Sequence, residues 1–312
     1  MRFSTLSLAL PLIAGLAGCA FETAESEPAE ESDATAESSE ALSSVLTWAD
    51  MPTSTITDGA HVYFTALDSN YQERIYRIPV NGGTKQSLVA CTGCGKLALD
   101  SSYVYFNTGA ALFRIAKGGG SKTKLAASAV DGFADMAVSG SYLYFAGPDG
   151  VKRVPKAGGS VKVLSTKAKS VRGLALDSSY VYWVNIDGGT IRRVPKAGGT
   201  TTTLLTATEP FDIVVDASRI YWTNLQGLIW RANKDGSNPW YVAAGQATPT
   251  DLASNGTHLF WTTDNSVKRL DKERLGITTL ASGQNGPEAI TVYGSAAYWS
   301  NYTGDQVMKA TF

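Results

Sequence analysis

The stretch IYWTNLQGLIWRANKDGSN at residues 220–238 is repeated, with changed polar residues, as VYWVNIDGGTIRRVPKAGG at residues 181–199. Both copies begin with one hydrophobic residue and two aromatic residues. The same triplet occurs seven times, starting at residues 62, 104, 143, 181, 220, 259 and 297. The intervals of 38 to 42 residues match the length of a four-stranded blade of a β-propeller.

Each repeat can be divided into four short strands. In the fourth repeat, an apolar strand at 174–176 ends in Asp177-Ser178-Ser179, and the aromatic strand follows. Residues 191–194 alternate in polarity, and 201–205 follow a Gly-Gly turn. Period-two alternation and glycine turns indicate strands rather than helices. The sequence therefore predicts an all-β, seven-bladed β-propeller over residues 43–312, with the repeated tryptophans packed between blades.

The two ends of this region complement each other. After the last triplet there is room for one strand only, Gln306–Thr311. Residues 43–48 resemble the outer strand of the other repeats, so we expect them to supply the outer strand of the last blade. Closing the ring in this way removes free strand edges, which would otherwise invite aggregation.

The first residues, MRFSTLSLALPLIAGLAGC, carry one cation and an apolar run at 6–17 that is too short for a stable membrane span. Leu16-Ala17-Gly18-Cys19 resembles the bacterial lipobox. The resemblance implies a lipoprotein signal peptide over residues 1–18 and a bilayer anchor on acylated Cys19. Ala20 resembles an outer-membrane sorting signal, so we expect a lipid-anchored protein of the bacterial envelope. An ordinary secretory signal with a chance Cys is the alternative.

Residues 19–42 contain eight carboxylates, all between Glu22 and Glu40, and no Lys or Arg. Such a segment buries too little apolar surface to fold, and we expect an acidic disordered tether. Residues 43–312 carry 26 basic and 20 acidic residues, a formal charge of +6. This modest charge on an exported chain argues against nucleic acid as a partner, and we expect a monomer.

Tyr221-Trp222-Thr223-Asn224, followed by Asp235-Gly236-Ser237-Asn238, resembles a YWTD repeat of the low-density-lipoprotein-receptor class B propellers. Two features differ, since Asn replaces the Asp of that family and its propellers have six blades. Members of the family are non-catalytic extracellular receptors, so the resemblance implies a binding role.

Residues for catalysis are scarce, and we assign no catalytic residue. The two histidines, His61 and His258, precede the triplet in different blades and cannot form a common site. No G-x-S-x-G or H-E-x-x-H motif occurs. Cys91-Thr92-Gly93-Cys94 lies between two blades, and in an exported protein we expect a disulfide that staples this loop. A redox pair and a metal site are the alternatives.

The candidate site is the mouth of the channel, on the face formed by the loops from each outer strand to the next inner strand. One repeat position there is occupied in successive blades by Ser54, Lys96, Asp135, Gly173, Asp212, Asp251 and Ala289. We expect Asp135, Asp212 and Asp251, with Glu288 beside them, to bind a metal such as Ca²⁺ or a cationic group of a partner. The alternative is that each Asp ties down its own loop backbone. Further candidates for contact with a ligand are Trp48, Phe133, Arg172 and Phe211.

A second ring, on the opposite face, consists of lysines at the turns between third and fourth strands: Lys117, Lys156, Lys196, Lys234 and Lys272. These lysines could meet an anionic lipid or polysaccharide, or they could be solvated turn residues.

These observations together favour a binding or scaffolding module of the envelope that recognises a protein or a glycan, such as a polysaccharide, through one face of the propeller. An enzyme of the propeller lyase or hydrolase kind is the main alternative, and a purely structural envelope protein is a third. A Lys or His beside a carboxylate in the channel mouth would favour the enzyme.

Overall fold

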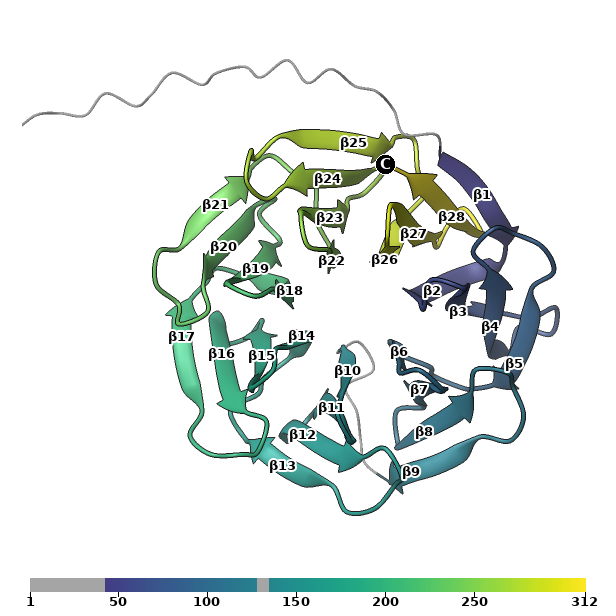
Figure 1. Ribbon diagram of the computed structural model, residues 1–312, viewed down its shortest axis with the longest axis horizontal. Coiled ribbons are helices and arrows are strands. Elements are labelled where there is room, and N and C mark those ends of the chain that lie inside the picture. Colours follow the sequence, from purple (N-terminus) through teal and green to yellow (C-terminus); the bar gives the residue numbers. More distant parts are fainter. Residues whose placement is uncertain (1–42, 128–134) are drawn as a thin grey trace, which may run out of the picture. The chain divides into compact units, whose positions relative to one another are not determined.

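The computed structural model describes residues 43–127 and 135–312. These residues form 28 strands in seven antiparallel sheets of four, arranged around a central channel (Figure 1). The described ranges contain no helix, and hence none that could cross a membrane. The seven-bladed β-propeller predicted from the triplet spacing is thereby confirmed. The expected signal peptide, Cys19 and the tether lie outside the described residues.

Blade 1 comprises β2 (Asp50–Thr57), β3 (His61–Leu67), β4 (Glu73–Pro79) and β5 (Gln86–Ala90); blade 2 comprises β6 (Ala98–Leu99), β7 (Tyr103–Asn107), β8 (Ala111–Ala116) and β9 (Thr123–Ala127). Blade 3 comprises β10 (Met136–Ser139), β11 (Tyr142–Gly147), β12 (Gly150–Pro155) and β13 (Lys162–Ser165); blade 4 comprises β14 (Val171–Leu176), β15 (Tyr180–Asn185), β16 (Thr190–Pro195) and β17 (Thr202–Thr206). Blade 5 comprises β18 (Pro210–Val215), β19 (Arg219–Asn224), β20 (Ile229–Asn233) and β21 (Trp240–Ala243); blade 6 comprises β22 (Leu252–Ser254), β23 (His258–Thr262), β24 (Val267–Asp271) and β25 (Ile277–Ala281). Blade 7 comprises β26 (Pro287–Tyr293), β27 (Ala296–Asn301), β28 (Gln306–Thr311) and β1 (Ser43–Trp48).

The ring closes through blade 7. Strand β1 pairs antiparallel with β28, with Ser43 opposite Ala310 and Trp48 opposite Gln306. The prediction that residues 43–48 supply the outer strand of the last blade is therefore confirmed. The first and the last strands of the propeller thus belong to the same sheet, so both must be in place for blade 7 to form.

The repeated triplet lies in the second strand of every blade, and its side chains alternate between the two neighbouring blades. Trp183 packs in a cluster with Tyr144 of blade 3, whereas Tyr182 packs with Ile213 and Trp222 of blade 5. Because successive side chains of a strand point to opposite faces, one triplet fills two interfaces between blades. The repeat thus serves packing, and its tryptophans lie between blades as predicted.

The lysine ring has a structural role that differs from both sequence interpretations. Four of these lysines form ion pairs with an Asp of the preceding blade: Lys117 with Asp58 (2.9 Å), Lys156 with Asp100 (2.8 Å), Lys234 with Asp177 (2.7 Å) and Lys272 with Asp216 (2.9 Å). The lysine side chains are only 7–26% exposed. They connect consecutive blades, so they are neither a free cationic surface nor solvated turns.

We call each of these ion pairs between a Lys and an Asp of neighbouring blades a clamp. The Asp of a clamp also accepts hydrogen bonds from groups of its own blade. Asp177 accepts hydrogen bonds from the amides of Ser179 and Tyr180 and from the Tyr182 hydroxyl. Burial alone would raise the pKa of Asp177, but the hydrogen bond from Lys234 and those from the two amides lower it to about 2. The fifth lysine, Lys196, meets Ser139 instead, with 2.7 Å between Nζ and Oγ.

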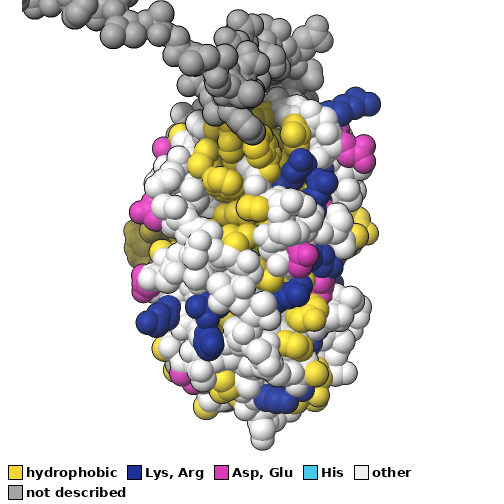
Figure 2. Space-filling model, turned by 90° about the vertical axis from the view of Figure 1, so that its left-hand side faces the viewer, with side chains coloured by type: hydrophobic (Ala, Val, Ile, Leu, Met, Phe, Trp, Pro, Cys, Tyr) yellow, Lys and Arg dark blue, Asp and Glu magenta, His cyan; other side chains and the backbone are white. Residues whose placement is uncertain are grey.

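The outer strands form the rim of the propeller. Figure 2 shows the rim from the side of β17 and β21, where hydrophobic side chains gather in the upper part among side chains of both charges. On β21, Trp240 and Tyr241 are 57% and 45% exposed and stack with 5.4 Å between ring centroids.

Candidate functional site

The seven equivalent residues at the starts of the inner strands form a ring around the channel, which we call the channel ring: Ser54, Lys96, Asp135, Gly173, Asp212, Asp251 and Ala289. Five of them, Ser54, Lys96 and the three aspartates, line two cavities at once. One is the channel mouth, with a volume of about 690 Å³. The other is the inner channel, of about 320 Å³, whose further walls are largely apolar. The channel ring is therefore the polar floor of the mouth.

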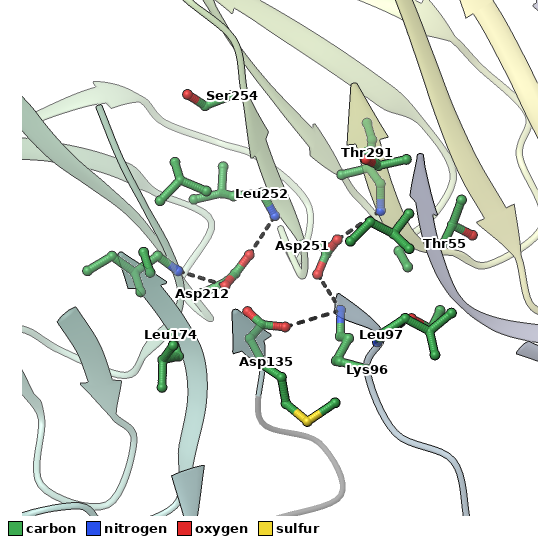
Figure 3. A pocket seen from close by; sticks show the side chains of 18 of the residues that line it. Thr55, Lys96, Leu97, Asp135, Leu174, Asp212, Asp251, Leu252, Ser254 and Thr291 are labelled. Atoms are coloured by element: carbon green, nitrogen blue, oxygen red, sulfur yellow. Dashed lines mark hydrogen bonds and ion pairs between the residues drawn. The ribbon is translucent and has the colours of Figure 1, made fainter. Parts of the chain in front are cut away.

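A lysine lies among the aspartates of the channel ring (Figure 3). The Nζ of Lys96 is 2.5 Å from Oδ1 of Asp251 and 3.9 Å from Oδ1 of Asp135. Burial alone would lower the pKa of Lys96, but the charges of Asp251 and Asp135 raise it above its usual range. The ammonium therefore stays protonated and neutralises part of the acidic floor.

The aspartates also bind backbone amides of the next blade. Oδ2 of Asp212 accepts a hydrogen bond from the Leu252 amide (2.7 Å), and Oδ2 of Asp251 accepts one from the Ile290 amide (2.8 Å). Ser54 accepts from the Leu97 amide in the same way (3.2 Å). Asp212 also accepts the hydrogen bond from its own backbone that the sequence alternative expected, from the Ile213 amide, and all three residues link neighbouring blades. These links join the inner strands of neighbouring blades.

Gly173 interrupts this series of links, and Asp212 compensates for the missing side chain. Oδ1 of Asp212 accepts a hydrogen bond from the amide of Ile213 at 2.7 Å, the amide that a side chain at position 173 would meet. A Cβ on Gly173 would lie 2.5 Å from that Oδ1 and 2.5 Å from the Ile213 nitrogen. The absence of a side chain at position 173 therefore lets Asp212 bind two amides at once.

The Thr of the YWTN stretch positions one of these aspartates. The Thr223 hydroxyl, which is fully buried, accepts a hydrogen bond from the Asp212 amide (3.1 Å). Thr65 and Ser300 hold the amides of Ser54 and Ala289 in the same manner. A hydroxyl directly after the triplet thus fixes the backbone of the channel ring.

Asp135 and Asp212 are close enough to share a proton. Burial raises the pKa of Asp212 well above its usual range, and the charges of Asp135 and Asp251 raise it further. Burial also raises the pKa of Asp135, to about 6, against the opposing effect of Lys96. Two carboxyls in contact cannot both ionise easily, so at neutral pH we expect Asp212 to carry the proton and Asp135 to accept a hydrogen bond from it.

This arrangement does not support the expected Ca²⁺ site at Asp135, Asp212 and Asp251. In residues 43–127 and 135–312, no group of three or more His, Cys, Asp or Glu side chains is placed to hold a metal ion. Lys96 supplies the positive charge among these carboxylates, and backbone amides occupy an oxygen of Asp212 and of Asp251. Hard cations need several free oxygen ligands, which the floor does not offer.

The walls of the mouth come from the loops of that face. Arg172, Phe211 and Glu288, all singled out from the sequence, line it. The Arg172 guanidinium lies over the Phe211 ring, 5.2 Å from its centroid. The other wall residues are Thr53, Glu73, Gly93, Cys94, Gly95, Thr248, Thr250, Thr263, Asp264, Gly286, Pro287 and Tyr302. The mouth has the size that is usual for a ligand cavity, and its walls combine apolar side chains with several charged ones.

One of the predicted contact residues, Trp48, does not line the mouth. Trp48 is 65% exposed and lines a separate cavity of about 450 Å³ at the seam between β1 and blade 1, together with Asp305. Phe133 lies outside the described residues. The histidines line neither channel cavity, since each is the first residue of the second strand of its blade.

Cys91 and Cys94 form a disulfide, as expected from their position in an exported chain. The loop that they close is held by Glu73, whose Oε2 accepts hydrogen bonds from the amides of Gly93 and Cys94. Both Cys side chains are buried, which fits a staple of the loop that carries Lys96. The role of Glu73 had no sequence signal, because it precedes its partners by 20 residues.

Lys96 is the main functional residue whose role the sequence reasoning missed. Its place in the channel ring was visible from the repeat, and so was the contrast of one cation with three aspartates. What the repeat could not show is that residues from blades 2 and 6 meet across the channel. Tyr302 was likewise visible as a loop residue of the same face but carried no distinguishing signal.

No protein-family model and no curated protein matches the sequence. Solved structures do share the fold. The structure of streptogramin B lyase aligns with a TM-score of 0.73 at 15% identity, covering 86% of this chain and 96% of that one. A chain of a nidogen/laminin complex aligns with a TM-score of 0.53 at 18% identity, covering 80% and 89%.

A third similar structure is PorZ, a bacterial surface component of the type-IX secretion system of Porphyromonas gingivalis. It aligns with a TM-score of 0.65 at 13% identity, covering 85% of this chain and 37% of the PorZ chain. This chain thus matches little more than a third of PorZ. At such identities these likenesses show the fold and do not assign a function.

Proposed function

We propose that this protein is a lipid-anchored binding or scaffolding module of the bacterial cell envelope, acting as a monomer, that recognises a protein or glycan through the channel mouth. The observation that carries this proposal is the mouth cavity of about 690 Å³, framed by loops that differ from blade to blade on a constant scaffold. Binding residues concentrate on such loops. By their names, one of the similar structures is a complex between two proteins, nidogen and laminin, and another, PorZ, is a bacterial surface component.

A rigid floor supports binding at this place. The inner strands are linked by Asp212 and Asp251 to the next blades, and the disulfide loop is held by Glu73. A ligand that enters the mouth therefore meets side chains whose positions are already set. Little conformational entropy is then lost on binding, which increases affinity.

The proposed anchor and tether belong to the same function. Acylated Cys19 would hold the chain in the outer membrane, and residues 19–42, when extended, would place the propeller up to about 80 Å away. Radiolabelled palmitate should label the wild-type protein in cells and should not label Cys19→Ser. Equal labelling of both proteins would contradict the lipid anchor.

The binding role is tested by pull-down from envelope extract with the full chain as bait. The variant Phe211→Ala/Tyr302→Ala removes two wall residues that make no hydrogen bond to the channel ring. Glu273→Gln, in the turn between β24 and β25 on the opposite face, is the matched control. A partner retained by wild type and control and lost by the double variant would support the proposal. Capture of the same partners by all three baits would contradict it.

A second candidate function is that of a lyase or hydrolase with its active site in the channel mouth. The specific observation in its favour is the contact of Lys96 with Asp251, an acid–base pair of the kind that the sequence analysis named as the discriminator. The raised pKa of Lys96 makes the ammonium a poor general base, and we therefore rank this function second. Consumption of streptogramin B by the wild type and not by Lys96→Met would favour it over binding.

A further inference from the structure

We infer that the channel mouth binds a ligand through a protonated amine or guanidinium group, held by Glu288 between the aromatic walls of the cavity. This inference rests on the proposed function, in which the mouth is the binding site, and names the chemistry of its ligand. It does not depend on the three aspartates of the channel ring, which already have partners.

The charge balance of the cavity is the first argument. Among the described residues, six acidic side chains line it against two basic ones: Glu73, Asp135, Asp212, Asp251, Asp264 and Glu288 against Lys96 and Arg172. Even with Asp212 protonated, the carboxylates outnumber the cations. A concave surface with low-dielectric walls concentrates such a field. The mouth therefore repels phosphates and acidic polysaccharides and attracts cations.

Glu288 is a partly buried carboxyl of the mouth that could accept a hydrogen bond from a ligand. It is partly buried in the wall of the mouth, and its carboxylate receives no hydrogen bond from any other described residue. Burial raises its pKa, and the charge of Asp251 adds to this, while Lys96 and Arg172 act in the opposite direction. Partial burial makes the charged form of Glu288 unfavourable without a hydrogen-bond donor, so a hydrogen-bonding cation of a ligand would stabilise it.

The protein itself contains two cations held in the ways that we infer for the ligand. The ammonium of Lys96 lies against Asp251 at 2.5 Å, and the guanidinium of Arg172 lies 5.2 Å from the centroid of the Phe211 ring. The first shows that a carboxylate of this cavity accepts an ammonium, and the second that an aromatic wall accepts a guanidinium. Cation–π contacts of this kind strengthen when water is excluded. Tyr302 is a further aromatic residue that lines the same mouth as Glu288.

The same chemistry could come from a basic side chain of a partner protein or from a small organic amine. The test uses the full chain in isothermal titration calorimetry at low salt. The probes are a capped Gly-Arg-Gly peptide, the same peptide with uncharged citrulline in place of Arg, agmatine and gluconate. The proteins are the wild type, Glu288→Gln and the opposite-face control Glu273→Gln, each checked for an unchanged unfolding temperature.

We expect the Arg peptide to bind the wild type and Glu273→Gln equally. Its affinity should fall about ten- to a hundredfold on Glu288→Gln, because one charge-assisted hydrogen bond is lost. The citrulline peptide should bind more weakly by a similar factor, and gluconate should not bind. Tighter binding of the peptide than of agmatine would assign the cation to a polypeptide, and the reverse order would assign it to a small amine.

Equal binding of the Arg and citrulline peptides, or an affinity unchanged in Glu288→Gln, would overturn the inference. So would the absence of binding by both cationic probes. A partner captured in the pull-down in a Phe211- and Tyr302-dependent manner would leave the binding function standing in that case. The two failures are therefore distinguishable.

Discussion

Lys96 of blade 2 and Asp251 of blade 6 form an ion pair across the channel, with 2.5 Å between Nζ and Oδ1, although 155 residues separate them in the sequence. The second oxygen of Asp251 accepts the amide of Ile290 in blade 7. The Asp251 carboxylate thus connects blades 2, 6 and 7. Blades 2 and 6 are not neighbours in the ring (Figure 1). The channel ring is therefore a structural element as well as the floor of the candidate site.

Removal of the Lys96 charge should destabilise the propeller. In Lys96→Met, Asp251 loses its counter-ion and the pKa of Asp135 rises further because Lys96 no longer lowers it, and we expect a loss of about 3 kcal/mol in the free energy of unfolding. Urea denaturation at neutral pH measures it. Adding Asp251→Asn, which preserves an acceptor for Ile290, should restore part of the loss. The exposed Lys162→Met, which removes only a hydrogen bond to a backbone carbonyl, should have little effect.

Asp135 should make stability fall as the pH rises from about 4 to about 6. Its pKa of about 6 in the folded protein exceeds the ordinary value of 3.8. In this window the unfolded chain has released the proton that the folded state still holds, so the contribution of Asp135 to stability is lost. At about 1.4 kcal/mol per pKa unit, the loss amounts to at most about 3 kcal/mol. Asp135→Asn should flatten this part of the pH profile of the unfolding free energy, whereas a profile as steep as that of wild type would refute the assignment.

The clamp between Asp177 and Lys234 should act at the acidic end of the pH range. The folded-state pKa of Asp177 is lowered to about 2, so its stabilisation is complete above about 4 and is lost as the pH falls toward 2. We expect Asp177→Asn to cost about 2 kcal/mol at pH 7, with the difference from wild type shrinking below pH 4. Chemical denaturation at a series of pH values measures this. A constant difference at all pH values would show that the charge is not responsible.

Blade 3 lacks the Asp of this clamp, and restoring it should stabilise the protein. Lys196 donates a hydrogen bond to the Ser139 hydroxyl and lies over the Tyr144 ring, 5.7 Å from its centroid, and burial lowers its pKa. In Ser139→Asp the ammonium would gain a carboxylate, and we expect a gain of about 1 kcal/mol in the free energy of unfolding. Ser139→Ala removes the hydrogen bond and should reduce stability. If Ser139→Asp is no more stable than Ser139→Ala, the clamp is not a general device of this fold.

Gly173 should not tolerate a side chain. In Gly173→Ala the new Cβ would lie 2.5 Å from both Asp212 Oδ1 and the Ile213 nitrogen, so Asp212 must give up a hydrogen bond or the strand must move. We expect a loss of about 2 kcal/mol, measured by thermal or urea unfolding. Gly118→Ala, where the added Cβ would have no atom within 4 Å, is the matched control and should be close to neutral.

The candidate site was predictable only in part, and the clamps show why. Asp177 and Lys234 were both visible as turn residues of the repeat, yet their contact depends on how far each blade rotates relative to the next. The channel ring was visible as one repeat position, but the effect of Gly173 on Asp212 was not, because it arises from steric contact between strands. Trp48 was assigned to the mouth from its loop type, and the seam of the ring places it elsewhere.

The sequence by itself determined the number of blades, the order of four strands in each blade and the closure of the ring through residues 43–48. These features follow from local alternation of polarity and from a regular spacing of aromatic residues, which need no knowledge of distant contacts. Only the tertiary structure decided which charges meet. Lys96 and Asp251 come from opposite sides of the ring, and the energy of a charge depends on its distance to other charges and on its burial. Those two quantities exist only once the blades have closed around the channel.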